Sequence, residues 1–112
     1  MGKESRLGEL EELVLLSVLR LGEDADGGSV RDELAEAAER SVSVSTVYVT
    51  LMRLEEKGFA TSWKGEPTAE RGGKARRMYA VTEEGRAALE AVRAVRDRLW
   101  SGVVAASGAA GG

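Results

Sequence analysis

The spacing of apolar residues changes from helical to alternating once along this chain, and that change constrains the fold more than any other feature. Apolar side chains recur every three or four residues in the first half of the chain, which predicts helices over 9–21, from 29, and over 44–57. Residues 59–63 and 76–81 instead favour strands, because alternation and β-branched or aromatic residues replace the helical spacing. A helical pattern then returns from residue 83 to about Trp100.

Residues that begin or end helices support these boundaries. Gly22 and Gly58 stand where glycine commonly follows the last turn of a helix. Ser29 is expected to cap the second helix and Thr82 the last, while the break at 41–43 supplies a capping serine for the third. The predicted order is therefore helix, helix, helix, strand, loop, strand, helix.

Composition excludes several kinds of function. A chain of 112 residues suits one domain, and the absence of cysteine and histidine rules out disulfides, thiol nucleophiles and Ser-His-Asp hydrolysis. The adjacent pairs Glu11-Glu12 and Glu55-Glu56 point to different helix faces, so they do not form a paired acid and base. We predict no enzyme activity, no metal and no cofactor. Without a long apolar stretch or a signal-like start, the expected partners exclude a membrane and the expected location is the cytoplasm.

Charge is distributed unevenly, although the formal net charge is only −3. Residues 1–40 hold 5 basic and 11 acidic side chains, whereas residues 41–82 hold 7 basic and 4 acidic. Phosphate binding depends on the local field, so the second segment is compatible with a nucleic-acid partner. Its most basic part, Arg71 to Arg77, has two interpretations: a contact surface for phosphates, or a solvated loop whose charge serves solubility.

The order of elements predicts a mainly α fold with a small β-hairpin wing (α+β), that is, a winged helix-turn-helix. We expect the winged helix-turn-helix domain over 7–82, a C-terminal dimerisation helix over 83–100, and a flexible tail rich in Gly, Ala and Ser over 101–112. The last helix carries a thin apolar stripe, and the alternative to dimerisation is that it folds back onto its own domain.

In this fold the third helix can enter the major groove, and the hairpin can reach the backbone or the minor groove. Val47, Leu51 and Leu54 define the buried side of that helix, so the opposite side and the basic hairpin are the candidates for DNA contact. Tyr48, at the flank, fits a phosphate contact or a half-buried core position equally. The candidate DNA-binding residues are Ser45, Thr46, Tyr48, Val49, Arg53, Lys64, Arg71, Lys74, Arg76 and Arg77.

Three stretches of this sequence resemble the PadR family of bacterial transcriptional regulators. They are residues 7–16, residues 44–58 with the ending Arg-Leu-Glu-Glu-Lys-Gly, and residues 72–79 followed by Thr-Glu-Glu-Gly at 82–85. The resemblance extends from about residue 7 to residue 100. It implies a dimeric winged-helix repressor on a roughly palindromic operator, in the short form of the family with one C-terminal helix.

The resemblance also implies that the last helix forms the homodimer together with the first. The candidate interface residues are Leu10, Leu13, Val92, Val95, Leu99 and Trp100. Some short members are similar to multidrug sensors whose effector lies between the subunits, so a small-molecule effector of unknown identity is an expected partner beside the double-stranded DNA operator. Control by expression level alone remains an alternative. A winged-helix module that binds protein instead of DNA is the main rival interpretation.

Overall fold

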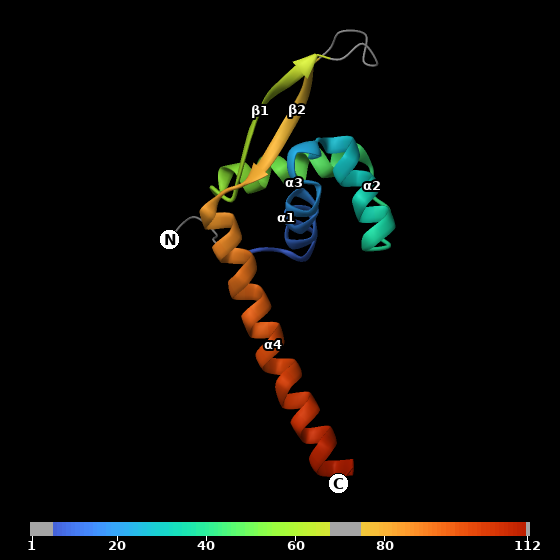
Figure 1. Cartoon of the computed structure of the whole chain (residues 1–112), viewed down its shortest axis with the longest axis vertical. Coiled ribbons are helices and arrows are strands. Elements are labelled where there is room, and N and C mark those ends of the chain that lie inside the picture. Colours follow the sequence, from blue (N-terminus) through green and yellow to red (C-terminus); the bar gives the residue numbers. More distant parts are fainter. Residues whose placement is uncertain (1–5, 68–74, 112) are drawn as a thin grey trace.

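The computed structural model describes residues 6–67 and 75–111 (Figure 1). A two-stranded antiparallel hairpin and a long last helix follow a bundle of three helices, as the sequence predicted. The elements in chain order are α1 (Glu9–Leu21), the short 3-10 helix η1 (Gly22–Asp24), α2 (Gly27–Ala37), α3 (Val44–Glu56), β1 (Ala60–Pro67), β2 (Ala75–Val81) and α4 (Glu83–Gly111).

The core lies where α1, α2 and α3 meet. Each helix contributes fully buried branched aliphatic side chains, and Val47, Leu51 and Leu54 are all 0% exposed, as the helical spacing of α3 predicted. Complete burial of one such side chain stabilises the fold by about 1.5–3 kcal/mol. Phe59 and Tyr79 extend this core to the base of the hairpin.

The helix ends follow the sequence signals with one exception. Gly22 and Gly58 have positive φ angles of 60° and 82°, a conformation that glycine adopts without strain. The Gly85 N–H donates to Thr82 Oγ1 at 3.0 Å, which confirms the predicted cap of α4. The cap predicted for α2 was wrong: Asp26, not Ser29, begins the helix, and the Ser29 N–H donates to the Asp26 carboxylate at 2.8 Å.

The hairpin strands are longer than predicted: β1 continues to Pro67 instead of ending at residue 63, and β2 begins one residue earlier, at Ala75. Met78 and Tyr79 are both buried, whereas strict alternation would expose one of them. A third backbone segment, just before α2, lies along the free edge of β2. The Tyr79 N–H donates to the Ala25 carbonyl at 2.9 Å, and Asp26 forms a bridge with Met78.

The last helix, α4, continues to Gly111, although the sequence predicted an end near Trp100 and a flexible tail over 101–112. Adding residues to an existing helix needs no new nucleation, and the alanines at 105, 106, 109 and 110 are the strongest helix formers. Residue 112 lies outside the described residues. The helix extends away from the bundle on the side opposite the hairpin (Figure 1), which gives the chain extents of 63 × 35 × 21 Å. Among the described residues, none of the helices is both long and apolar enough to cross a bilayer.

Candidate nucleic-acid interface

One face of α3 is fully available to a ligand. Ser45, Thr46, Val49 and Arg53 are all exposed, while the opposite face of the same helix forms the core. The helix begins at Ser43, whose hydroxyl accepts from the Thr46 N–H at 3.1 Å and donates to the Thr46 hydroxyl at 3.0 Å. The structure therefore brings the predicted recognition residues together on one surface.

A shallow groove runs beside this exposed face. It has a volume of about 310 Å³ and is bounded on the far side by Leu10 of α1. Thr50 lies in the groove wall, where its hydroxyl donates to the Thr46 carbonyl at 2.8 Å and is thus satisfied within the helix. Met52, which the sequence analysis did not select, is also exposed on α3.

Tyr48 lies over the first residue of α2. A Cβ atom at Gly27 would stand 2.3 Å from the Tyr48 ring, so only glycine leaves room for that ring. Tyr48 as a whole is 38% exposed, and the start of α2 covers part of its ring. This exposure lies between that of a free phosphate contact and that of a core residue. This contact fixes the position of α3 relative to α2.

The hairpin presents two basic residues on the side of α3. Lys64 lies directly opposite Arg77, and Ser62 lies opposite Tyr79 two residues nearer the bundle, so these side chains share one face of the hairpin. Ser62 donates to Glu55 of α3 at 2.6 Å, which shows that this face turns toward α3. Like charges directly opposite each other destabilise a hairpin, and a bound anion would relieve that repulsion.

Hydrogen bonds connect this basic pair to α3. Arg77 Nε donates to the Ser62 hydroxyl at 3.2 Å, and the Ser62 hydroxyl donates to Glu55. Burial raises the pKa of Tyr79, and the negative charge of Glu55 raises it further, so Tyr79 remains neutral beneath this network at neutral pH. The contact between Glu55 and Ser62 could not be predicted from the sequence, because only the folded hairpin brings them together.

Arg76, a predicted DNA contact, forms an ion pair within the protein. Its Nε lies 3.3 Å from a carboxylate oxygen of Asp26, whose side chain is only 4% exposed. Its Nη2 atom also donates to the Met78 sulfur at 3.5 Å. Asp26 thus caps α2 and holds the second wing strand at the same time. The remaining predicted wing residues, Arg71 and Lys74, lie outside the described residues.

The predicted interface residues divide into two groups. Leu10 and Leu13 are partly buried and pack against the core of their own chain, and Val92 is partly buried. Val95, Leu99 and Trp100 are 47%, 67% and 65% exposed, and among the described residues no other element covers them.

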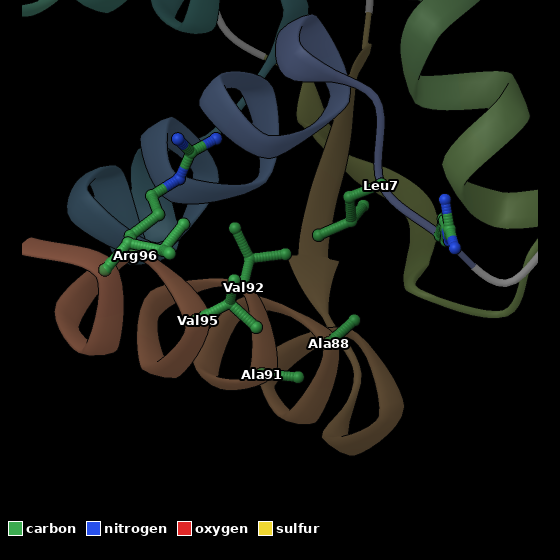
Figure 2. Close-up of a pocket in the computed structure, with 8 residues that line it drawn as sticks. Leu7, Ala88, Ala91, Val92, Val95 and Arg96 are labelled. Carbon is green, nitrogen blue, oxygen red and sulfur yellow. The ribbon is translucent and has the colours of Figure 1, made fainter.

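Two grooves flank α4 where it leaves the bundle. The larger, of about 620 Å³, lies between α4 and the segment before α1, with Leu7 on one side and Val92 and Val95 on the other (Figure 2). The second, of about 400 Å³, includes Trp100. Arg96 borders both grooves and donates to Glu12 of α1 at 2.9 Å, a hydrogen bond that raises the pKa of the Arg96 guanidinium.

The described residues contain no cluster of three or more acidic side chains that could hold a metal ion. The exposed face of α3 and the neighbouring hairpin pair present hydroxyls, one aliphatic side chain, and guanidinium or ammonium groups. Such groups form hydrogen bonds with base edges and ion pairs with phosphates.

The comparisons with known proteins agree with this geometry. A family model described as the transcriptional regulator PadR-like family matches residues 15–91. A crystal structure of a PadR family transcriptional regulator from Eggerthella lenta is 31% identical, with a TM-score of 0.64 over 85% of this chain and 82% of that chain. A PadR-like regulator from Bacillus cereus is 20% identical, with a TM-score of 0.68 over 84% of this chain and 86% of that chain.

Bacillus subtilis PadR, solved in complex with operator DNA, is 24% identical, with a TM-score of 0.60 over 73% of this chain and 46% of that chain. A search of curated protein sequences gives no match. The last two structures share the fold, while the family model and the Eggerthella lenta protein carry the assignment. The chain therefore belongs to the PadR-like family of transcriptional regulators, which are not enzymes.

Proposed function

We propose that this protein is a sequence-specific DNA-binding regulator that inserts α3 into the major groove and lays the hairpin along the backbone. The exposed face of α3 carries this proposal, because Ser45, Thr46, Val49 and Arg53 share it and the basic pair Lys64 and Arg77 lies on the same side. A related protein, Bacillus subtilis PadR, has been solved in complex with operator DNA, which supports DNA binding by this chain.

In this mode the residues have different tasks. Hydroxyls at the start of α3 can read base edges, Val49 can contact a thymine methyl group, and the Arg53 guanidinium can bind a guanine or a phosphate. Lys64 and Arg77 supply phosphate contacts that carry affinity without sequence information.

The regulator acts as a homodimer in this proposal. Val95 and Leu99 of α4 are exposed beside the larger groove, and a second copy of α4 would cover them. The twofold dimer would then place two α3 helices on the half-sites of a pseudo-palindromic operator, about one helical turn apart. In this proposal the dimer represses transcription in the cytoplasm. A small molecule that changes the angle between the subunits would release it from the operator.

Binding of the purified protein to duplex DNA from upstream of its own gene, compared with random-sequence duplex across a salt series, tests this function. We expect tighter binding to the upstream duplex and a steep salt dependence. Lys64→Gln should weaken binding to both duplexes and reduce the salt slope by about one, whereas Thr46→Ala should change base preference at constant slope.

The absence of binding to either duplex at low salt would contradict the proposal. It would favour the alternative of a winged-helix module that binds protein, which the overall negative charge permits. Equal and weak binding to both duplexes would mean that the upstream region holds no operator, and a selection from random duplexes would then replace it as the probe.

A further inference from the structure

A polar pocket lies between the start of α1 and the C-terminal half of α3, next to the exposed face of that helix. It has a volume of about 450 Å³. Arg6 and Gly8 border it from the segment before α1, and Thr50, Arg53 and Lys57 border it from α3 and its C-terminal end. Arg6 did not appear among the candidate DNA contacts, because nothing in the sequence places it beside α3.

The pocket has a fixed ion pair on one side. Lys57 Nζ lies 2.8 Å from Glu11 Oε1 and also donates to the Arg6 carbonyl at 2.7 Å. The same Glu11 oxygen accepts from the Gly8 N–H at 2.7 Å. Burial alone would raise the pKa of Glu11, but the hydrogen bonds from Gly8 and Lys57 and the charges of Lys57 and Arg53 lower it. Glu11 is therefore ionised at neutral pH, and Lys57 neutralises it.

In the described part of the chain, two guanidinium groups beside the pocket have no carboxylate within salt-bridge distance. Among the described residues, neither Arg6 nor Arg53 forms a salt bridge, whereas Arg20, Arg31 and Arg40 each have one. The four charged groups around the pocket, three basic and one acidic, give it a net charge of +2. A concave site with two unpaired guanidiniums is suited to a phosphate group, which arginine binds through parallel N–H donors.

The pocket is continuous with the recognition face of α3. Leu10, Thr50 and Arg53 border both this pocket and the groove that contains Ser45 and Thr46. From Ser45 to Arg53 the helix rises about 12 Å, at 1.5 Å per residue. The major groove is about 12 Å wide, so a helix that places Ser45 inside it brings Arg53 and its neighbours to the bordering phosphates.

We infer that this pocket binds a phosphodiester of the DNA backbone at the edge of the major groove, through Arg6 and Arg53. The inference rests on the proposed function and adds a contact from the segment before α1. Arg6 then supplies affinity and register, and Arg53 is held near the same phosphate, which leaves base reading chiefly to Ser45, Thr46 and Val49.

The test measures the affinity of the full chain for a random-sequence duplex across a salt series, for the wild type, Arg6→Gln, Arg6→Lys and Arg20→Gln. Arg6→Gln should reduce the slope of log K against log salt by about 0.9, the value for one lost phosphate contact. Arg6→Lys should restore most of that slope. Arg20→Gln loses the same charge about 17 Å away along α1 and should keep the wild-type slope.

If the wild type shows a steep salt dependence and Arg6→Gln has the same slope of log K against log salt, the inference is overturned and the proposed function stays intact. A wild type without salt-dependent binding would contradict both. Calorimetric titration with inorganic phosphate at constant ionic strength separates a backbone phosphate from a free one. Phosphate binding that Arg6→Gln abolishes, together with an unchanged DNA slope, would assign the pocket to a small phosphate compound and overturn the DNA contact.

Discussion

Asp26 connects α2 to β2 through its buried carboxylate and its backbone. It caps α2 through the Ser29 N–H, pairs with Arg76 of β2, and its backbone forms a bridge with Met78. Arg76 therefore orients the second wing strand relative to the helix-turn-helix. This role differs from the DNA contact that the sequence predicted for Arg76, and the two roles have opposite consequences when the carboxylate is neutralised.

Asp26→Asn separates the two roles of Arg76. Asparagine keeps the capping oxygen but loses the charge, so we expect the free energy of unfolding in urea to fall by about 1–2 kcal/mol. Affinity for DNA should also fall, because the wing loses its anchor. If Arg76 instead contacts DNA directly, its release would raise the affinity. The control Asp24→Asn removes the same charge from an exposed position and should change neither quantity.

Glu11 predicts a dependence of stability on pH. Because its pKa is lowered on folding, its contribution is complete above its unfolded pKa of about 4.5 and is lost as the pH falls through the lower folded value. Glu11→Gln should therefore cost about 1–2 kcal/mol at neutral pH and less near pH 3. Urea unfolding at both pH values measures this. A constant difference across pH would contradict it, and exposed Glu36→Gln serves as the control.

At the scale of elements, the sequence predicted well whatever depends on local signals. The bounds of α1 were predicted fully, and α3 was predicted to within one residue, because spacing and caps lie inside each segment. The exposed face of α3 followed from helical phase alone.

Features that depend on pairing between distant segments were not predictable. The pairing of Arg76 with Asp26 joins residues that are far apart in the chain, and the length of β1 depends on its register with β2. Serine is a common helix cap, and Ser29 was therefore predicted to cap α2. In the structure Asp26 caps α2, because the segment before this helix is held against β2. For the same reason, a basic residue in the wing could not be assigned to DNA or to the protein from its type.

The contact between α2 and α3 gives a prediction with a neighbouring control. Gly27→Ala places a methyl group 2.3 Å from the Tyr48 ring, so the ring must move and the free energy of unfolding should fall by about 1–3 kcal/mol. At Gly28, one residue later, the nearest atom to an added Cβ is 4.0 Å away. Gly28→Ala should therefore be neutral or stabilise by up to about 1 kcal/mol. Equal losses in thermal unfolding would contradict this account.

At the scale of the whole molecule, one end of the protein is cationic, and the other carries exposed apolar side chains. The exposed face of α3, the Lys64 and Arg77 pair and the pocket near Arg6 form one cationic region, although the chain as a whole is acidic. The acidic side chains concentrate in the first 40 residues of the sequence. At the other end, α4 extends from the bundle with apolar side chains that its own chain leaves exposed (Figure 1).

This division predicts that oligomeric state and DNA affinity are coupled through α4. Leu99→Glu places a charge in the apolar groove and should shift the dimer toward the monomer in sedimentation experiments. The monomer retains an intact α3 and hairpin, so its affinity for random duplex at one half-site should remain, while the gain from two linked half-sites is lost by a factor of about 100 or more. Ala94→Glu adds the same charge on α4 outside both grooves and should leave the dimer intact. A monomeric wild type, or a dimer that survives Leu99→Glu with unchanged operator affinity, would show that the exposed stripe of α4 has another partner.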